Sequence, residues 1–177
     1  GSTNFNGSNS NSVNVFVGAV DRNTLYVADT LNNRIQRSTN NGQSWQFVGN
    51  GPGLGLGQFN APKGVVANFS DTIIFVSDTA NNRVQRSTNG GLNWVVIANA
   101  GVSTNQVNQP SGLAYDEGTD KLYIADTMNN RVLLVNAAST TTPVFTIFAG
   151  ATVGVVIGKF SRPQSVAISA AGAVCVA

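Results

Sequence analysis

The sequence predicts an all-β protein, a β-propeller of four-stranded antiparallel blades, with about three and a half blades in this chain. Three observations predict this fold class. A seven-residue motif returns at nearly constant spacing, short β-rich runs flank each copy, and turn-forming residues separate the runs. Units of about 40–50 residues that each hold four short strands are the sequence signature of a propeller blade.

The repeated motif begins with an aspartate and ends with an arginine and a β-branched residue. Its Asn-Asn pair tolerates left-handed backbone and so predicts a tight turn between two strands. Chance does not account for so close a match over three copies, and a fixed period of this length indicates a repeat architecture. The copies span 29–35 (DTLNNRI), 78–84 (DTANNRV) and 126–132 (DTMNNRV), which are 49 and then 48 residues apart.

Each unit is predicted to contain four strands in order. The innermost strand is small and apolar on both faces, as expected of a strand that is buried on both sides. The second strand directly precedes each aspartate, and the third begins at each arginine. The first strand covers 65–67 and 113–115, and the second covers 25–28, 74–77 and 122–125. The third covers 34–38, 83–87 and 131–135, and the fourth covers 45–48, 94–97 and 144–148. A fourth unit supplies its first two strands, 165–168 and 173–177.

The predicted organisation has a lead-in and one partial propeller. Residues 1–12 are Asn/Ser-rich, and Gly1-Ser2 is typical of what tag removal leaves behind. Residues 13–177 form the propeller, with blade 1 at about 13–50, blade 2 at about 62–99, blade 3 at about 110–150 and half of blade 4 at about 163–177.

Ring closure is the constraint that this organisation leaves unmet. A propeller protects its sheet edges by closing, and three and a half blades do not close a ring. We therefore expect either a longer chain or a homo-oligomer. A dimer is favoured, because two copies supply about seven blades of chain.

The repeat units resemble the NHL repeat family. The resemblance rests on 57–66 (GQFNAPKGVV), 74–78 (IFVSD) and 81–84 (NNRV), and it extends from about Val13 onward. It implies a complete domain of about six blades and a use in molecular interactions. Two segments, 38–45 (STNNGQSW) and 87–94 (STNGGLNW), also resemble the Asp-box, or BNR repeat, with Asn in place of Asp. That second resemblance implies that Trp45 and Trp94 are structural and pack between blades.

Composition excludes several function classes. Lys and Arg number ten and Asp and Glu eight, and no window clusters the basic residues, so nucleic-acid binding is not expected. No apolar run approaches the roughly 20 residues of a membrane span. With no histidine and one cysteine, neither a metal nor another cofactor is expected. Low charge and abundant Asn, Ser and Thr favour an extracellular or cell-surface location.

The predicted function is a non-catalytic binding or scaffolding module for a protein, peptide or glycan. No nucleophile–base–orienter triad is visible, and such triads usually rely on histidine, so the chain is not expected to be an enzyme. One alternative is a fragment of an NHL-like enzyme that resembles peptide-amidating lyase, with its catalytic residues outside this chain. Another is a purely structural piece of a propeller.

The charged residues of the motif have two interpretations. They form either a ligand-binding ring or, in each blade, a structural pair in which Asp caps the turn and Arg braces a neighbour. A feature that repeats in every blade belongs to the fold, which favours the structural pair. These residues are Asp29, Asp78 and Asp126 with Arg34, Arg83 and Arg131.

Three further sets of residues generate predictions. Lys63, Ser111 and Gln164 begin successive inner strands, so they are the candidate ligand-binding residues at one mouth of the central channel. Cys175 shares the strand position of Tyr26, Phe75 and Tyr123, which predicts a buried, inert thiol. The acidic loop residues suggest either calcium ligands or ordinary hairpin turns, and turns are favoured. They are Asp21, Asp71, Asp116, Glu117 and Asp120.

Overall fold

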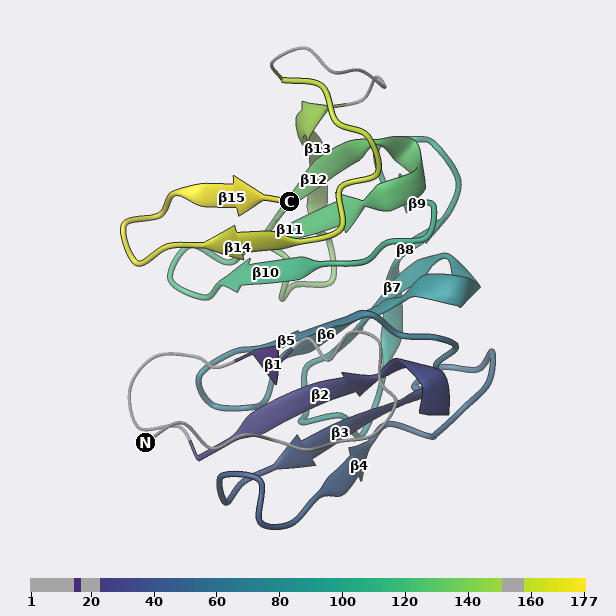
Figure 1. Ribbon diagram of the computed structural model, residues 1–177, viewed down its shortest axis with the longest axis vertical. Coiled ribbons are helices and arrows are strands. Elements are labelled where there is room, and N and C mark those ends of the chain that lie inside the picture. Colours follow the sequence, from purple (N-terminus) through teal and green to yellow (C-terminus); the bar gives the residue numbers. More distant parts are fainter. Residues whose placement is uncertain (1–14, 17–22, 151–157) are drawn as a thin grey trace.

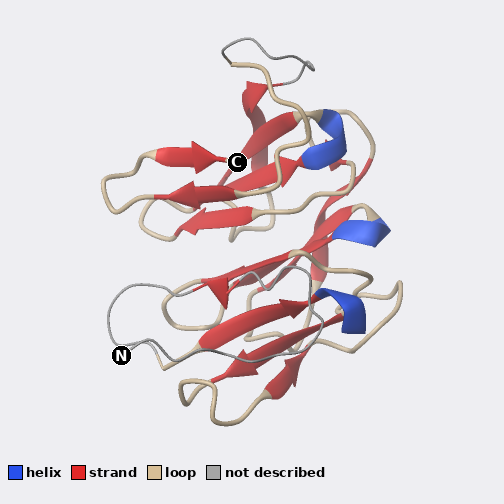
Figure 2. Cartoon of the chain, viewed as in Figure 1, coloured by secondary structure: helices blue, strands red, loops and turns tan. Residues whose placement is uncertain are grey.

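The computed structural model describes residues 15–16, 23–150 and 158–177, and these residues are all-β apart from three short 3-10 turns. The sheets follow one another in chain order along the molecule (Figure 1). Their inner strands adjoin, since β5 contacts β10 and β10 contacts β14. The three 3-10 turns lie along one side of the stack (Figure 2). This is the arrangement of part of a β-propeller.

The described strands form three antiparallel sheets and one further pair, as the predicted fold class requires. The first sheet comprises β1 (Val15–Phe16), β2 (Leu25–Asp29), β3 (Arg34–Ser38) and β4 (Gln46–Val48). The second comprises β5 (Gly64–Ala67), β6 (Ile74–Asp78), β7 (Arg83–Ser87) and β8 (Val95–Ala100), with β9 (Gln106–Val107) added in parallel. The third comprises β10 (Leu113–Asp116), β11 (Lys121–Asp126), β12 (Arg131–Asn136) and β13 (Val144–Gly150). A pair, β14 (Val166–Ile168) and β15 (Val174–Val176), begins the fourth. The fifth strand, β9, was not predicted.

The Asn-Asn pair makes the turn between the second and third strand of each blade. A 3-10 turn covers Thr30–Asn32, Thr79–Asn81 and Thr127–Asn129. The next residue, Asn33, Asn82 or Asn130, has a φ of 54°, 51° or 55°. Asparagine tolerates this left-handed backbone better than most residues, so the motif places it where the chain must reverse.

Alternation along the central strands joins each blade to both of its neighbours. In β6, Ile74 and Val76 pack toward the first sheet, whereas Phe75 packs toward the third. All three side chains are fully buried. Because successive residues of a strand point to opposite faces, a strand between two sheets carries apolar side chains on both faces.

One prediction about this packing is wrong. Tyr26, Phe75 and Tyr123 do pack against the following sheet, but Cys175 at the equivalent position is exposed. The strand position points toward the next blade, and among the described residues no sheet follows β14 and β15. The environment of this thiol is therefore set by the neighbouring sheet rather than by its own strand.

A polar cluster lies between the first two blades. The Tyr26 hydroxyl, Arg37 Nε and Asp71 Oδ1 are buried there without a hydrogen bond of good geometry. Burial raises the pKa of Tyr26 to about 12, the charge of Asp71 adds to the rise, and Arg37 opposes it. Ionisation of this phenol is therefore unfavourable in the folded protein.

We predict that Tyr26→Phe flattens the alkaline end of the stability profile. The pKa of the Tyr26 phenol is about 12 in the folded protein and 10 in the unfolded chain. The unfolded chain therefore releases this proton first, so the free energy of unfolding is unaffected below pH 10 and falls as the pH rises to 12. Over that interval the parent should lose about 2–3 kcal/mol more than the variant. Urea unfolding at several pH values measures the difference, and parallel profiles would contradict the prediction. Phe75 at the same position of blade 2 indicates that the blade accepts phenylalanine.

Candidate functional site

The aspartate and arginine of each motif form an ion pair at the turn. The distance from Asp Oδ2 to Arg Nε is 2.6 Å in blade 1, 2.6 Å in blade 2 and 2.7 Å in blade 3. Asp78 and Asp126 are completely buried. Burial raises the pKa of the Asp126 carboxyl, and hydrogen bonds from Asn108, Asn129 and Arg131 oppose that rise. The Asp126 carboxylate therefore depends on its hydrogen-bond donors to remain charged.

In blade 2 the ion pair holds the loop that enters the blade. Arg83 Nη1 donates to the carbonyl of Leu54 at 2.7 Å, and Nη2 donates to the carbonyls of Gly55 at 2.7 Å and Gln58 at 3.0 Å. The Asn60 backbone N–H donates to Asp78 Oδ1 at 2.7 Å. Blade 3 repeats these bonds between Arg131 and the carbonyls of Val102, Ser103 and Gln106.

The rest of the motif binds the loop that leaves toward the next blade. Thr79 Oγ1 donates to the carbonyl of Pro110 at 2.7 Å, and Asn82 Oδ1 accepts the backbone N–H of Gln109 at 2.9 Å. The same two bonds recur in the other blades. Each motif thus joins two connecting loops, and this geometry favours the structural interpretation of the charged pairs over a ligand-binding ring.

In blade 1 the same ion pair has no entering loop beside it among the described residues. Within the described residues, Arg34 bonds only Asp29, and its guanidinium lies 5.1 Å from the centre of the Phe47 ring. A hollow of about 430 Å³ lies beside them, lined by Asn32, Arg34, Phe47 and residues 49–52. In blades 2 and 3 the entering loop binds at the equivalent arginine.

The three residues that the sequence predicts at the channel mouth have different environments. Ser111 is 2% exposed, and its hydroxyl bonds Thr127 Oγ1 at 2.6 Å and the Gln164 carbonyl at 2.8 Å. Ser111 therefore joins the third and fourth sheets. Lys63 is partly buried and Gln164 is exposed, so these two are the members of the set that reach the surface.

The acidic loop residues of the described part act in turns and between blades. Asp116 accepts bonds from the Gly118 N–H and the Thr119 hydroxyl, and the latter lowers the pKa of Asp116. Glu117 Oε2 accepts the Phe69 N–H at 2.6 Å, and Asp120 accepts the Tyr115 hydroxyl at 2.8 Å. In the described residues no group of three His, Cys, Asp or Glu side chains gathers to hold a metal. Asp21 lies outside those residues.

Sequence reasoning missed a second pair of arginines. Arg37 and Arg86 lie three residues after the motif arginine, in β3 and β7, and each has a buried Nε without a hydrogen bond. The signal was present in the matching segments RIQRS and RVQRS, because an arginine repeated within a largely buried strand requires an explanation. Blade 3 has Leu134 at this position.

Comparison with known proteins shows the fold. No family model matches the chain, and no curated protein sequence does. The chain is similar to β-propellers among solved structures. A gluconolactonase from Xanthomonas campestris is 18% identical over 88% of this chain and 55% of its own, with a TM-score of 0.63. An auxiliary nutrient-binding protein from Bacteroides thetaiotaomicron is 13% identical over 88% and 43%, with a TM-score of 0.61. A chain of a nidogen/laminin complex is 16% identical over 83% and 48%, with a TM-score of 0.60.

The chain thus spans about half the length of each of these proteins. At such low identity the likeness shows that the fold is that of a β-propeller, and it carries no activity across. Among the described residues, no helix is long and apolar enough to cross a membrane.

We predict that the clamp matters more where it holds a loop. Asp78→Asn should cost about 3–5 kcal/mol of unfolding free energy, because it leaves Arg83 buried without its counter-charge. Asp29→Asn should cost less than half as much, since Arg34 is one-third exposed and holds no described loop. Urea denaturation followed by circular dichroism compares the two variants. An Asp29 variant as damaging as the Asp78 variant would contradict this account.

Proposed function

We propose that this chain is a non-catalytic binding and scaffolding module of the NHL type. The observation that carries the proposal is that the repeated acidic and basic groups of blades 2 and 3 are committed to connecting loops. What these blades leave open to solvent is polar loop surface and scattered apolar side chains, which suit recognition of a protein, peptide or glycan. Lys63 and Gln164 are the accessible candidates at the channel mouth.

The resemblance of two segments to the Asp-box is supported by their local hydrogen bonds. In the segment 87–94, the Gly91 N–H donates to Ser87 Oγ at 2.8 Å and the Asn93 N–H donates to Asn89 Oδ1 at 2.8 Å. Trp94 Nε1 donates to the Gly91 carbonyl at 2.9 Å. The segment 38–45 makes the same three bonds. Asparagine thus fixes the turn that aspartate fixes in the Asp-box.

The enzymatic alternative has one direct test. A gluconolactonase shares the fold, and an amidating lyase is the other propeller enzyme to consider. We predict that this chain opens glucono-δ-lactone no faster than buffer, because the described residues gather no nucleophile with a base. A pH-stat assay measures the rate. Turnover that is proportional to protein and is retained after repurification would overturn the non-catalytic proposal.

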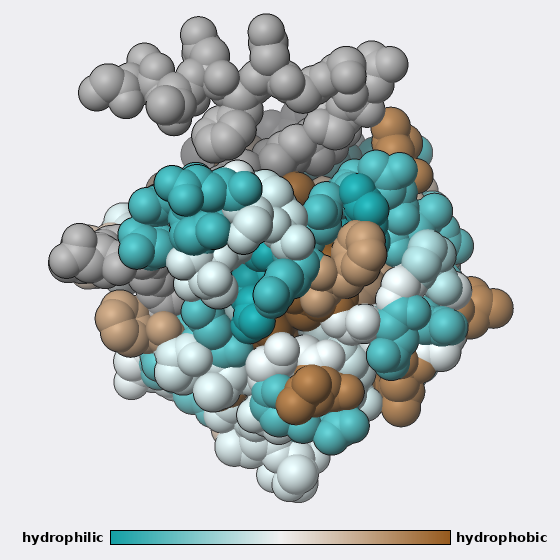
Figure 3. Space-filling view, turned by 90° about the horizontal axis from the view of Figure 1, so that it is seen from below, coloured by the Kyte–Doolittle hydropathy of each residue, from teal (hydrophilic) through white to brown (hydrophobic). Residues whose placement is uncertain are grey.

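We also propose that a second copy of this chain covers its end faces. Blades stack so that one face of each packs on the opposite face of the next, and among the described residues no sheet covers the outer face of the first sheet or of the last pair of strands. At one end Phe47 is 68% and Trp45 38% exposed, and at the other Cys175 is exposed. Figure 3 shows the end that carries β3 and β4, where apolar side chains lie at the surface among hydrophilic ones. Two copies joined head to tail bring unlike faces together and form a closed ring.

We predict concentration-dependent dimers in sedimentation velocity measurements. Phe47→Asp should shift the association to at least about tenfold higher concentration, because it puts a charge on the proposed contact face. Leu92→Asp is the matched control, since Leu92 is 77% exposed on a turn. A monomer at all concentrations would reject self-association, and the binding proposal would then be tested with ligands alone.

The low charge and high Asn, Ser and Thr content support an extracellular or cell-surface location for such a module.

A further inference from the structure

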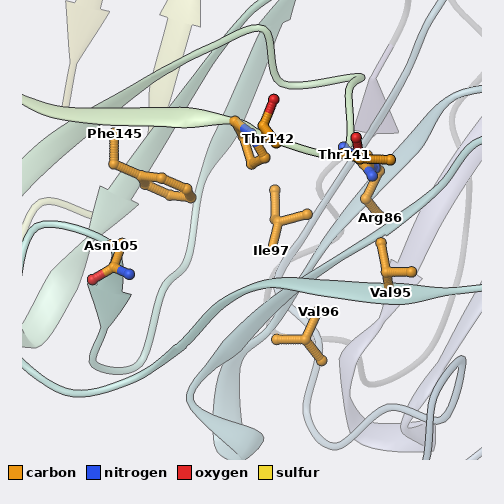
Figure 4. Close-up of a pocket in the computed structure, with 9 residues that line it drawn as sticks. Arg86, Val95, Val96, Ile97, Asn105, Thr141, Thr142 and Phe145 are labelled. Carbon is orange, nitrogen blue, oxygen red and sulfur yellow. The ribbon is translucent and has the colours of Figure 1, made fainter.

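A cavity of about 530 Å³ opens between the outer strands of blades 2 and 3. One wall is β8, through Val95, Val96 and Ile97, and the other is the segment Thr141–Pro143 with Phe145 of β13. Arg86 lies at one end with Thr141, Phe145 and Asn105 lie at the other, and Ile97 lies between them (Figure 4). The cavity is apart from the channel mouth and from both end faces.

A tryptophan fills the equivalent space between blades 1 and 2. Arg86 of β7 and Leu134 of β12 hold the same position in blades 2 and 3. The residue just before the strand partner of Arg86 is Trp94, and the one just before the strand partner of Leu134 is Phe145, so Trp94 and Phe145 are equivalent. Trp94 is 4% exposed and packs edge to face on Phe59, with ring centres 5.3 Å apart. Blade 3 has the smaller Phe145 and the segment 139–143 (STTTP) in place of an Asp-box. The cavity therefore follows from the sequence of blade 3.

Arg86 brings a positive charge to this cavity without an ion-pair partner among the described residues. The residue is 6% exposed. Its Nη1 donates to the carbonyls of Ala138 and Thr140, while Nε has no hydrogen-bond partner. The nearby carboxylate of Asp120 is occupied by the Tyr115 hydroxyl and by the N–H and hydroxyl of Ser139.

The balance of charge at Arg86 is thus incomplete. Burial lowers the pKa of the Arg86 guanidinium, and the charge of Asp120 only opposes that effect from a distance. A guanidinium has five N–H donors, and those on Nη1 bond backbone carbonyls that carry no net charge. Since a buried charge is costly without a counter-charge, an anion in the cavity would restore the balance.

We propose that this cavity binds a small organic carboxylate, with its charge at Arg86 and its apolar body against Ile97 and Phe145. The volume lies within the range of small-molecule sites, and the walls combine apolar side chains with polar ones that can orient a ligand. A carboxylate is the planar anion that an arginine binds best. Thr141 and Thr142 also line the cavity. The site names a ligand class within the proposed binding function, and it does not depend on self-association.

The first test compares acids with their neutral isosteres. Benzoate and hexanoate are titrated into the full chain by isothermal calorimetry, beside benzamide and hexanamide. We expect the acids to bind at least about tenfold more tightly, because the amide cannot supply the charge that Arg86 lacks. The weakest affinity that such a titration resolves is about 10 mM. If neither acid binds at that level, or if acid and amide bind equally, the proposal is overturned.

Variants then locate the site. Phe145→Trp should fill the cavity as Trp94 does one blade earlier and abolish acid binding while the melting temperature is kept. Arg86→Gln should reduce acid binding to that of the amide. Arg37→Gln is the matched control, since the space beside Arg37 is already filled, and acid binding should persist there. If Phe145→Trp binds the acids as the parent does, this cavity is not the site, whether or not Arg86→Gln folds. That result would leave the proposed binding at the channel mouth untouched.

Discussion

The buried ion pair at each turn is the interaction on which the rest of the structure depends. The loops between blades are irregular, and their backbone groups require partners once sheets close over them. Asp78 and Arg83 supply those partners for the entering loop, while Thr79 and Asn82 supply them for the loop that leaves. A short motif thus fixes the position of two neighbouring sheets as well as its own turn.

The apolar packing follows from the positions that the clamps set. Central strands must be apolar on both faces, as in β6, because each face contacts a different blade. Polar groups caught between blades then have consequences for ionisation, as the raised pKa of Tyr26 illustrates. The same layered arrangement creates the cavity beside Arg86, where one aromatic side chain is smaller than its counterpart.

The sequence was sufficient for the parts of the fold that a single unit specifies. The strands, their order and the Asn-Asn turn follow from short-range patterns, and the structure agrees with them. What depends on a neighbouring sheet was not predictable from one unit. Cys175 lies on a strand that resembles its buried counterparts, but its exposure is decided by what packs on the next face. Likewise β9 pairs through a loop without strand periodicity, and the space beside Arg86 depends on Phe145, which is remote in sequence.

Each motif binds the loop before it and the loop after it, and this repetition has an evolutionary consequence. The junctions that enter blades 2 and 3 use the same bonds, so a copied or deleted unit meets matching partners on both sides. Duplication or deletion of a unit can therefore lengthen or shorten such an array without inventing a new interface. Differences that accumulate in one copy, such as the loss of a tryptophan, then give that copy a property of its own while its junctions stay intact.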